Sequence, residues 1–340
     1  MVIRLISMLL MLVAAWPVAA CRNQSEPKSQ VVVYTALDRE YAEPILTKFK
    51  TETGVDVLPV YDTEAAKTTG LVSRLIEEKT RPRCDVFWNN EIIRTIQLKE
   101  MGLVEPYVSP NAASIPAAFK DAEGYWTGFA ARMRVLVYNP NLVSKAPEKF
   151  EDLVGPEWTG KIAMAYPLFG TTASHGAVLF AAWGPERAKV YFNALKNNGV
   201  RIVEGNGVAC RMVADGEIPM ALTDSDDANL IAGQGKPVKM VLLDHEGKGA
   251  LVIPNTVALV KGAPHADAGR RLIDYLLSPA VELELARSPS AQIPLHAGAT
   301  GLPPNVAGLA KTKMFQPDYA AAAAQVQPSA DFFKGLFTRP

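Results

Sequence analysis

The sequence lacks the features that would indicate nucleic-acid binding, a membrane-embedded body or a familiar kind of catalysis. Its basic and acidic residues balance at 35 each and form no basic block, which argues against nucleic acid as a partner. After the first twenty residues, no apolar run approaches the ~18 residues that a membrane-spanning helix needs. The G-x-S-x-G and H-E-x-x-H patterns of common hydrolases are missing. An exported hydrolase or transferase therefore has no support, and we do not expect an enzyme.

Cysteine and histidine are scarce, with three and four residues. Cys84 opens an apolar run and Cys210 lies in an expected helix of the other half of the chain. We expect both to be buried as small hydrophobic side chains, with a shared metal or thiol site as the less favoured alternative. The four histidines show no zinc-like spacing and are expected at the surface or at helix ends: His175, His245, His265 and His296.

The first residues have the features of an export signal. Arg4 supplies the charged start, and residues 5–15 are apolar but too short to span a bilayer. The stretch Val18-Ala-Ala-Cys21 resembles the lipobox of bacterial lipoproteins, in which Cys21 becomes the lipidated first residue; an ordinary secretory signal is the alternative. We expect a signal peptide at 1–20, a lipidated tether at 21–29 and a location in the periplasm or cell envelope. Which membrane holds the anchor stays open.

Strand-like and helix-like segments alternate along the mature chain. Expected strands lie at 30–34, 55–60 and 84–88, and expected helices at 41–51, 68–79 and 92–101. This alternation is typical of a parallel sheet covered on both faces. Two extended segments, 125–131 and 132–138, form a plausible crossover. A second α/β unit follows, with strands at 161–165, 218–223, 250–254 and 256–260. The length of the mature chain also favours two domains.

A series of short motifs runs through the mature chain. They occupy residues 33–37 (VYTAL), 84–91 (CDVFWNNE), 132–140 (RMRVLVYNP), 156–161 (PEWTGK), 205–217 (GNGVACRMVADGE) and 224–227 (DSDD). Together they resemble bacterial extracellular solute-binding proteins of the ferric-binding type, which serve ABC importers.

This resemblance implies an α/β, two-lobed periplasmic-binding-protein fold (type II) with two crossover strands and a ligand cleft between the lobes. We expect lobe 1 at 30–131 plus 257–307, and lobe 2 at 132–256 plus 308–340. The expected partners are the permease and ATPase subunits of an ABC importer, and we expect the protein itself to be a monomer. A ligand-binding sensor subunit for a membrane kinase would have the same fold and is the alternative role.

Three carboxylates, Asp224, Asp226 and Asp227, lie where an apolar strand meets an apolar helix-like run. Such corners are where open α/β sheets bind ligands. The resemblance places the tyrosine pair of ferric-binding relatives at Asp226 and Asp227, their histidine at Asp38 and their glutamate at about Asn90. None of those residue types is present here, so a tyrosine-dominated ferric site is not expected. Clustered carboxylates repel one another unless a cation relieves them, although an ordinary acidic helix start is the alternative.

Residues expected to hold an anion match the family pattern better. The resemblance assigns this role to Arg132, Thr171, Thr172 and Asn206. Hydroxyl groups and free backbone N–H groups at two helix starts, together with one guanidinium, form a suitable oxyanion site. Taken singly, Thr171, Thr172 or Asn206 would be only a helix cap, and Arg132 only a surface ion pair.

Two kinds of cargo fit these residues, and neither is a resident cofactor. The first is ferric iron or another hard metal ion, held by Asp226 and Asp227 with an anion on Arg132. The second is a small organic cation or zwitterion, such as an aminophosphonate, thiamine or a polyamine, with its amine on the aspartates. Four aromatic residues could stack on such a solute, although most aromatics at strand ends belong to the core: Tyr34, Tyr61, Trp88 and Trp126.

Overall fold

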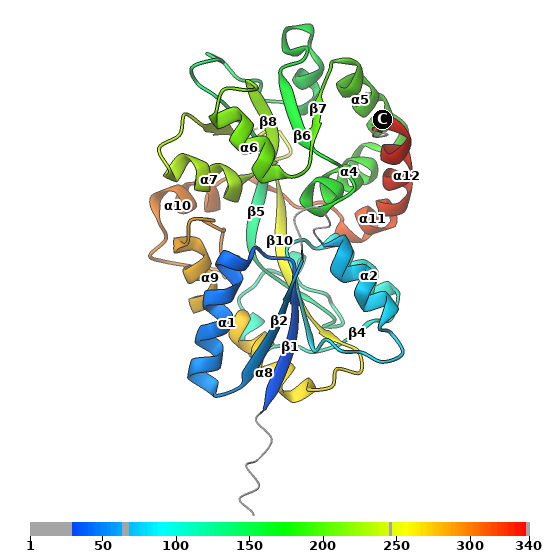
Figure 1. The fold of residues 1–340 in the computed structure, drawn as a ribbon, viewed down its shortest axis with the longest axis vertical. Helices are drawn as coiled ribbons and strands as arrows, with labels where there is room; N and C mark the ends of the chain where they lie inside the picture. The colour runs from blue at the N-terminus through cyan, green and yellow to red at the C-terminus, as the bar shows by residue number, and fades with distance from the viewer. Residues whose placement is uncertain (1–28, 63–67, 245–246, 338–340) are drawn as a thin grey trace, which may run out of the picture.

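The protein consists of two lobes stacked along its longest axis (Figure 1). The computed structural model describes residues 29–62, 68–244 and 247–337, so the predicted leader and Cys21 lie outside the described residues. Two long strands, β5 (Thr127–Tyr138) and β10 (Ala250–Val260), run from one lobe into the other. The predicted α/β fold with two crossover strands is confirmed. The two extended segments predicted before residue 138 form the single strand β5, and the two predicted after 250 form the single strand β10.

The first lobe is built on three parallel strands. β1 (Gln30–Thr35) lies between β2 (Asp56–Tyr61) and β3 (Val86–Asn89). Its β-branched residues alternate between the two covered faces of the sheet, as such residues favour. The helices of this lobe are α1 (Arg39–Thr53), α2 (Thr69–Glu77), α3 (Ile93–Glu100), α8 (Ala266–Leu276) and α9 (Pro279–Arg287).

The second lobe repeats this arrangement. β6 (Ile162–Ala165) lies between the parallel strands β7 (Arg201–Val203) and β8 (Met220–Asp224). Its helices are α4 (Gly170–Trp183), α5 (Pro185–Asn197), α6 (Asn206–Ala214), α7 (Ser225–Gly233), α11 (Tyr319–Ala324) and α12 (Val326–Leu336). The smaller elements are α10 (Pro304–Ala310), β4 (Val104–Glu105), β9 (Lys239–Val241) and β11 (Met314–Phe315).

One continuous sheet path, β2-β1-β3-β10-β5-β8-β6-β7, joins the lobes. β5 pairs antiparallel with β10 as far as Met133, which lies opposite Val252. From Arg134, which lies opposite Asp224, it pairs antiparallel with β8. β5 therefore changes partner between two adjacent residues, and the arginines on either side of Met133 lie at the junction of the lobes. The exact lobe boundaries stay predictions.

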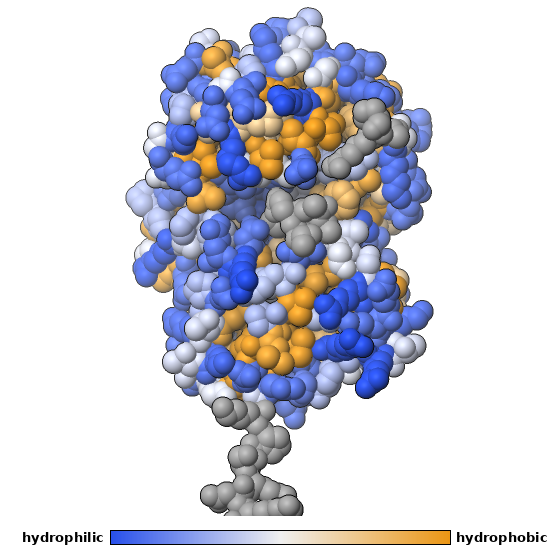
Figure 2. All heavy atoms as spheres, in the orientation of Figure 1, coloured by the Kyte–Doolittle hydropathy of each residue, from blue (hydrophilic) through white to orange (hydrophobic). Residues whose placement is uncertain are grey.

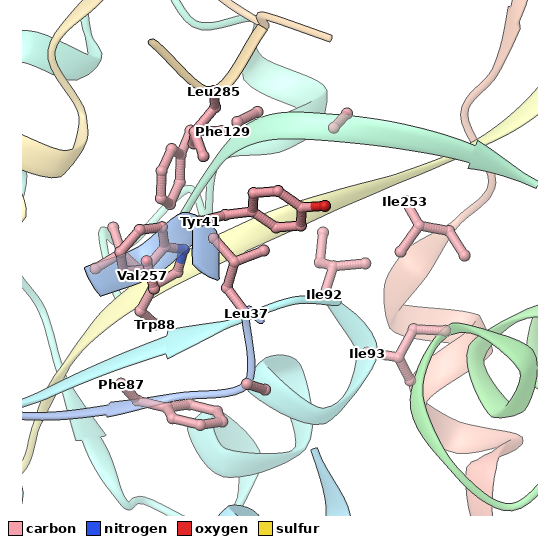
Figure 3. Close-up of a cluster of buried hydrophobic side chains, with 14 of the residues drawn as sticks. Leu37, Tyr41, Phe87, Trp88, Ile92, Ile93, Phe129, Ile253, Val257 and Leu285 are labelled. Atoms are coloured by element: carbon pink, nitrogen blue, oxygen red, sulfur yellow. The ribbon is translucent and has the colours of Figure 1, made fainter. Parts of the chain in front are cut away.

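A buried apolar cluster supports the junction from the first lobe (Figure 3). Trp88 on β3 packs against Phe129 on β5, with ring centroids 5.7 Å apart. Val257 on β10 and Leu285 on α9 belong to the same cluster. Tyr41 on α1 lies on this cluster with its hydroxyl pointing away from Trp88. The cluster fixes the end of β3 and the start of α1, which both lead to the site described below.

The crossover region is tightly bonded. Ala130 has a φ of 43°, which is uncommon for a residue with a side chain, and the register of β10 against β5 shifts between Pro254 and Asn255. The fully buried Asn255 amide donates to the Ala130 carbonyl and, at 2.7 Å, to Gln292 Oε1. A third segment also meets β5 here, because Ala131 and Ile293 exchange backbone hydrogen bonds of 2.8 and 2.7 Å. The predicted hinge at 130–135 and 254–257 stays a prediction.

The cysteine prediction is confirmed and the histidine prediction is wrong in two places. Cys84 and Cys210 are free, fully buried and in different lobes. His175 and His296, expected at the surface or at helix ends, are only 4% and 5% exposed. Each ring has a tertiary neighbour that its local sequence does not reveal: His175 packs 4.9 Å from Phe150, and His296 pairs with a buried carboxylate. His245 lies outside the described residues. Among the described helices, none has the length and apolarity to cross a membrane.

Candidate ligand site between the lobes

All nine residues predicted to bind ligand line one cavity between the lobes. Its free volume is about 40 Å³. On the face shown in Figure 2, hydrophilic residues lie at the waist between the lobes, as they do over much of that surface. The predicted lining residues are Asp38, Asn90, Arg132, Thr171, Thr172, Asn206, Asp224, Asp226 and Asp227. The structure thus brings the predicted set together, while its role in binding stays a prediction.

Chain topology explains why these residues meet. The carboxyl ends of parallel strands lie at one edge of a sheet, and ligands of open α/β sheets bind there. Asn90 directly follows β3, and Asp38 directly precedes α1 after β1. In the second lobe, Asp224 ends β8 and Asn206 begins α6. Because both lobes present these edges to the waist, residues far apart in the sequence face one cavity.

Both carboxylate oxygens of Asp224 accept hydrogen bonds. Its Oδ1 accepts from Arg134 Nη1 at 2.7 Å, and its Oδ2 accepts from Asn206 Nδ2 at 3.0 Å and from the Thr171 hydroxyl. Thr172 Oγ1 donates to Asn206 Oδ1 at 3.0 Å and so orients that amide toward Asp224. The side chains of Thr171, Thr172 and Asn206 do not cap their own helices. The groups predicted to hold an anion therefore hold an internal carboxylate.

Arg132 links the two lobes. Its Nε lies 3.0 Å from Asp226 Oδ2, Nη1 donates to the Asn90 carbonyl at 2.5 Å, and Nη2 donates to Asn255 Oδ1 at 3.1 Å. The residue is only 2% exposed, so it is not the surface ion pair of the alternative interpretation. Burial alone would lower the pKa of Arg132, but the carboxylates around it, chiefly Asp226, outweigh burial and raise it.

Carboxylates outnumber basic groups among the residues that line the cavity. Five carboxylates line it, from Asp38, Glu204, Asp224, Asp226 and Asp227. The guanidinium groups of Arg132 and Arg134 pair with Asp226 and Asp224, respectively. Oxygen atoms of Asp224, Asp226 and Asp227 lie within 4.8 Å of one another. Such a set of oxygens is suited to a hard cation.

A second cavity of about 230 Å³ adjoins the first. Asp38, Asp226 and Asp227 line both cavities. Tyr41 and Arg211 are among the other residues of the second cavity. Burial raises the pKa of Tyr41, as do a hydrogen bond with Glu40 and the charges of Asp226 and Asp38. The carboxylates of Asp38, Asp226 and Asp227 are therefore shared by a narrow cavity and a wider one.

The sequence interpretation missed groups that lie in or beside the cavity. Arg134 could have been found, because it lies two residues from Arg132 on the same strand and so shares its face. Glu204 and the rings of Tyr166 and Phe169 also line the cavity, but no local pattern indicates them. The four aromatic residues proposed for stacking do not line it: Tyr34, Tyr61, Trp88 and Trp126. Of these, Tyr34 and Trp88 are fully buried in the core.

Residues 95–322 match the family described as bacterial extracellular solute-binding protein, and the chain belongs to this family. It is a solute-binding protein of the two-lobed periplasmic type. It is 24% identical over 295 residues to iron uptake protein A1 of Synechocystis sp. (strain ATCC 27184 / PCC 6803 / Kazusa), covering 83% of this chain and 80% of the relative. A Salmonella typhi protein, named provisionally as 2-aminoethylphosphonate-binding and periplasmic, is 27% identical over 61% of each chain. That match covers less than two thirds of either protein.

Solved structures show the same fold. Iron-bound HitA from Pseudomonas aeruginosa superposes with a TM-score of 0.79 at 24% identity, covering 91% of this chain and 99% of that one. The ferric binding protein from Campylobacter jejuni gives a TM-score of 0.82 at 21% identity, with 91% and 100% covered. These likenesses establish the architecture, and the side chains in the cavity must decide the ligand.

Proposed function

We propose that this solute-binding protein captures a hard metal ion, ferric iron or one of similar chemistry, and presents it to the permease and ATPase of an ABC importer. The observation behind the proposal is the set of oxygen atoms from Asp224, Asp226 and Asp227 within 4.8 Å of one another. In this proposal Asp226 and Asp227 bind the ion directly, and Asp38 faces it from the other lobe.

Size and charge both support an ion as the cargo. A cavity needs roughly 10–15 Å³ to hold one water molecule, so the ~40 Å³ between the lobes suits an ion with a few small ligands. Carboxylate oxygens are preferred ligands of hard cations, and five carboxylates line the cavity. Relatives and structural neighbours named for iron agree with this choice.

A thermal-shift screen of the metal-stripped protein tests the proposal. A ligand that binds only the native state raises the melting temperature by mass action. Ferric citrate and divalent metals would be compared with an aminophosphonate, thiamine and polyamines. We expect stabilisation by a metal and none by the organic solutes. A shift with an organic cation and none with any metal would overturn the metal assignment.

A small organic cation is the second candidate. The wider cavity of about 230 Å³ shares Asp38, Asp226 and Asp227 with the narrow one. An amine at these carboxylates would leave room for the rest of an organic molecule beside Tyr41. The relative named for 2-aminoethylphosphonate binding agrees with such a solute. The same screen separates this candidate from the metal.

We also propose that Cys21 is lipidated and tethers the protein in the cell envelope. Small residues directly before this cysteine, and a polar segment after it, support the proposal. Replacing Cys21 by Ser is expected to release the protein into the soluble fraction. An unmodified native chain that begins at another residue, seen by mass spectrometry, would contradict it.

A further inference from the structure

We infer that Asp224 is a built-in anion, and that the cargo is therefore a cation that enters without a companion anion. This inference rests on the proposed metal-ion function and refines the class of its substrate. From their chemistry alone, Thr171, Asn206 and a guanidinium are expected to hold an anion. In the structure the anion that they hold is the carboxylate of Asp224.

The hydrogen bonds around Asp224 leave little room for an external anion. Both of its oxygens accept hydrogen bonds, Oδ1 from Arg134 and Oδ2 from Thr171 and Asn206. The residue is only 4% exposed. A phosphate or carbonate at the same donors would have to displace Asp224 or lie against its charge, and like charges at such distances are strongly unfavourable.

The surroundings of Arg134 explain why the protein places the carboxylate of Asp224 at this point. The residue is 1% exposed, and its Nε and Nη2 have no hydrogen-bond partner within the part of the chain that the structure describes. A buried guanidinium without a counter-charge is costly. Asp224 lies within ion-pair distance of it, at 2.7 Å. Removing the carboxylate would therefore leave a pocket of matching shape and charge for a small external anion.

Arg132 does not provide a second anion site. Its three nitrogens contact Asp226, the Asn90 carbonyl and Asn255. An anionic group on the cargo would compete with Asp226 for this guanidinium and would lie among the carboxylates that line the cavity. The arrangement therefore favours a simple cation over either a metal–anion pair or a zwitterion.

The first test needs no metal. In metal-free Asp224→Ala, formate should occupy the vacated place beside Arg134 and raise the melting temperature by a few degrees. The same formate concentration should leave the wild type unchanged. Asp224→Asn, which fills the space without the charge, should also show no formate effect, as should the surface variant Asp215→Ala. If formate stabilises all four proteins equally, or none of them, the assignment of Asp224 as a built-in anion is wrong. This conclusion holds whatever the metal-binding measurements show.

The second test measures metal affinity with and without formate or phosphate. We expect the wild-type affinity to change less than about threefold on adding either anion. Asp224→Ala should bind metal at least tenfold more weakly than the wild type, and formate should restore most of the loss. A wild-type protein that binds metal tenfold more tightly when an anion is added would overturn the inference. If neither protein binds any metal, the proposed function fails, while the formate test of the variants still decides the role of Asp224.

Discussion

Arg134 on β5 and Asp224 on β8 lie directly opposite each other in the sheet, and their Nη1 and Oδ1 atoms are 2.7 Å apart. Their side chains are only 1% and 6% exposed. The pair stands where β5 changes its partner from β10 to β8. The pair therefore affects both the stability of the second lobe and the charge in the ligand cavity.

Replacing Arg134 by Met should be strongly destabilising. The change leaves Asp224 buried without its cation, and breaking such a pair from one side typically costs ~3–5 kcal/mol. Urea denaturation of the metal-free protein measures the loss. The exposed pair Lys236–Asp215, at 3.1 Å, is the matched control, and Lys236→Met should cost less than ~1 kcal/mol. Equal losses in the two variants would contradict the account of the buried pair.

Closure about the crossover strands should accompany binding. Two lobes joined by strands move as nearly rigid bodies, and a few hinge residues absorb the change. Ala130 and Asn255 lie where β5 and β10 are irregular. Small-angle scattering should show a smaller radius of gyration for the loaded protein than for the stripped one. A ligand that binds tightly without any compaction would contradict the hinge.

Stability should depend on pH through His296. Its Nδ1 lies 2.6 Å from Glu282 Oε2 and its Nε2 lies 2.9 Å from the Asn111 carbonyl. Both partners are acceptors, so the imidazolium satisfies them best. Burial alone would lower the pKa of His296, but the hydrogen bonds to Glu282 and Asn111 outweigh burial and raise it.

The sign of the effect follows from this shift. A raised native pKa contributes stability that is fully present below the unfolded value of about 6.5 and is lost as the pH rises through the native value. We expect the free energy of unfolding to fall with rising pH over this range in the wild type. The fall should be smaller in His296→Gln. Superimposable pH profiles of the two proteins would show that His296 has no such role.

The positions of the site residues could be predicted because the fold places them by a simple rule. Asp38 and Asn90 follow strands and Asp224 ends one, and the carboxyl ends of these strands face the waist. Such strands can be recognised from apolar and β-branched runs. The family motifs then indicated which strand ends matter. The structure brings all of the predicted residues to one cavity.

The pairing of charges could not be predicted, because it depends on register and packing between distant segments. Arg134 and Asp224 are 90 residues apart, and a shift of one residue between β5 and β8 would turn the arginine to the other face. For the same reason the expected anion site proved to contain an internal carboxylate. The burial of His296 depends on Glu282 from α9, a helix that the sequence interpretation did not identify.

The most direct test of the central claim is the metal content of the protein after metal loading. Stripped protein would be exposed to ferric citrate or divalent metals, passed through a desalting column and analysed by mass spectrometry of the elements. The account predicts one metal ion per chain in the wild type and in Asp215→Ala. It predicts a loss of roughly two to three orders of magnitude in affinity for Asp226→Ala, as expected when one partner of a buried charge interaction is removed. A wild-type protein that retains no metal, or an Asp226→Ala variant that retains as much as the wild type, would contradict it.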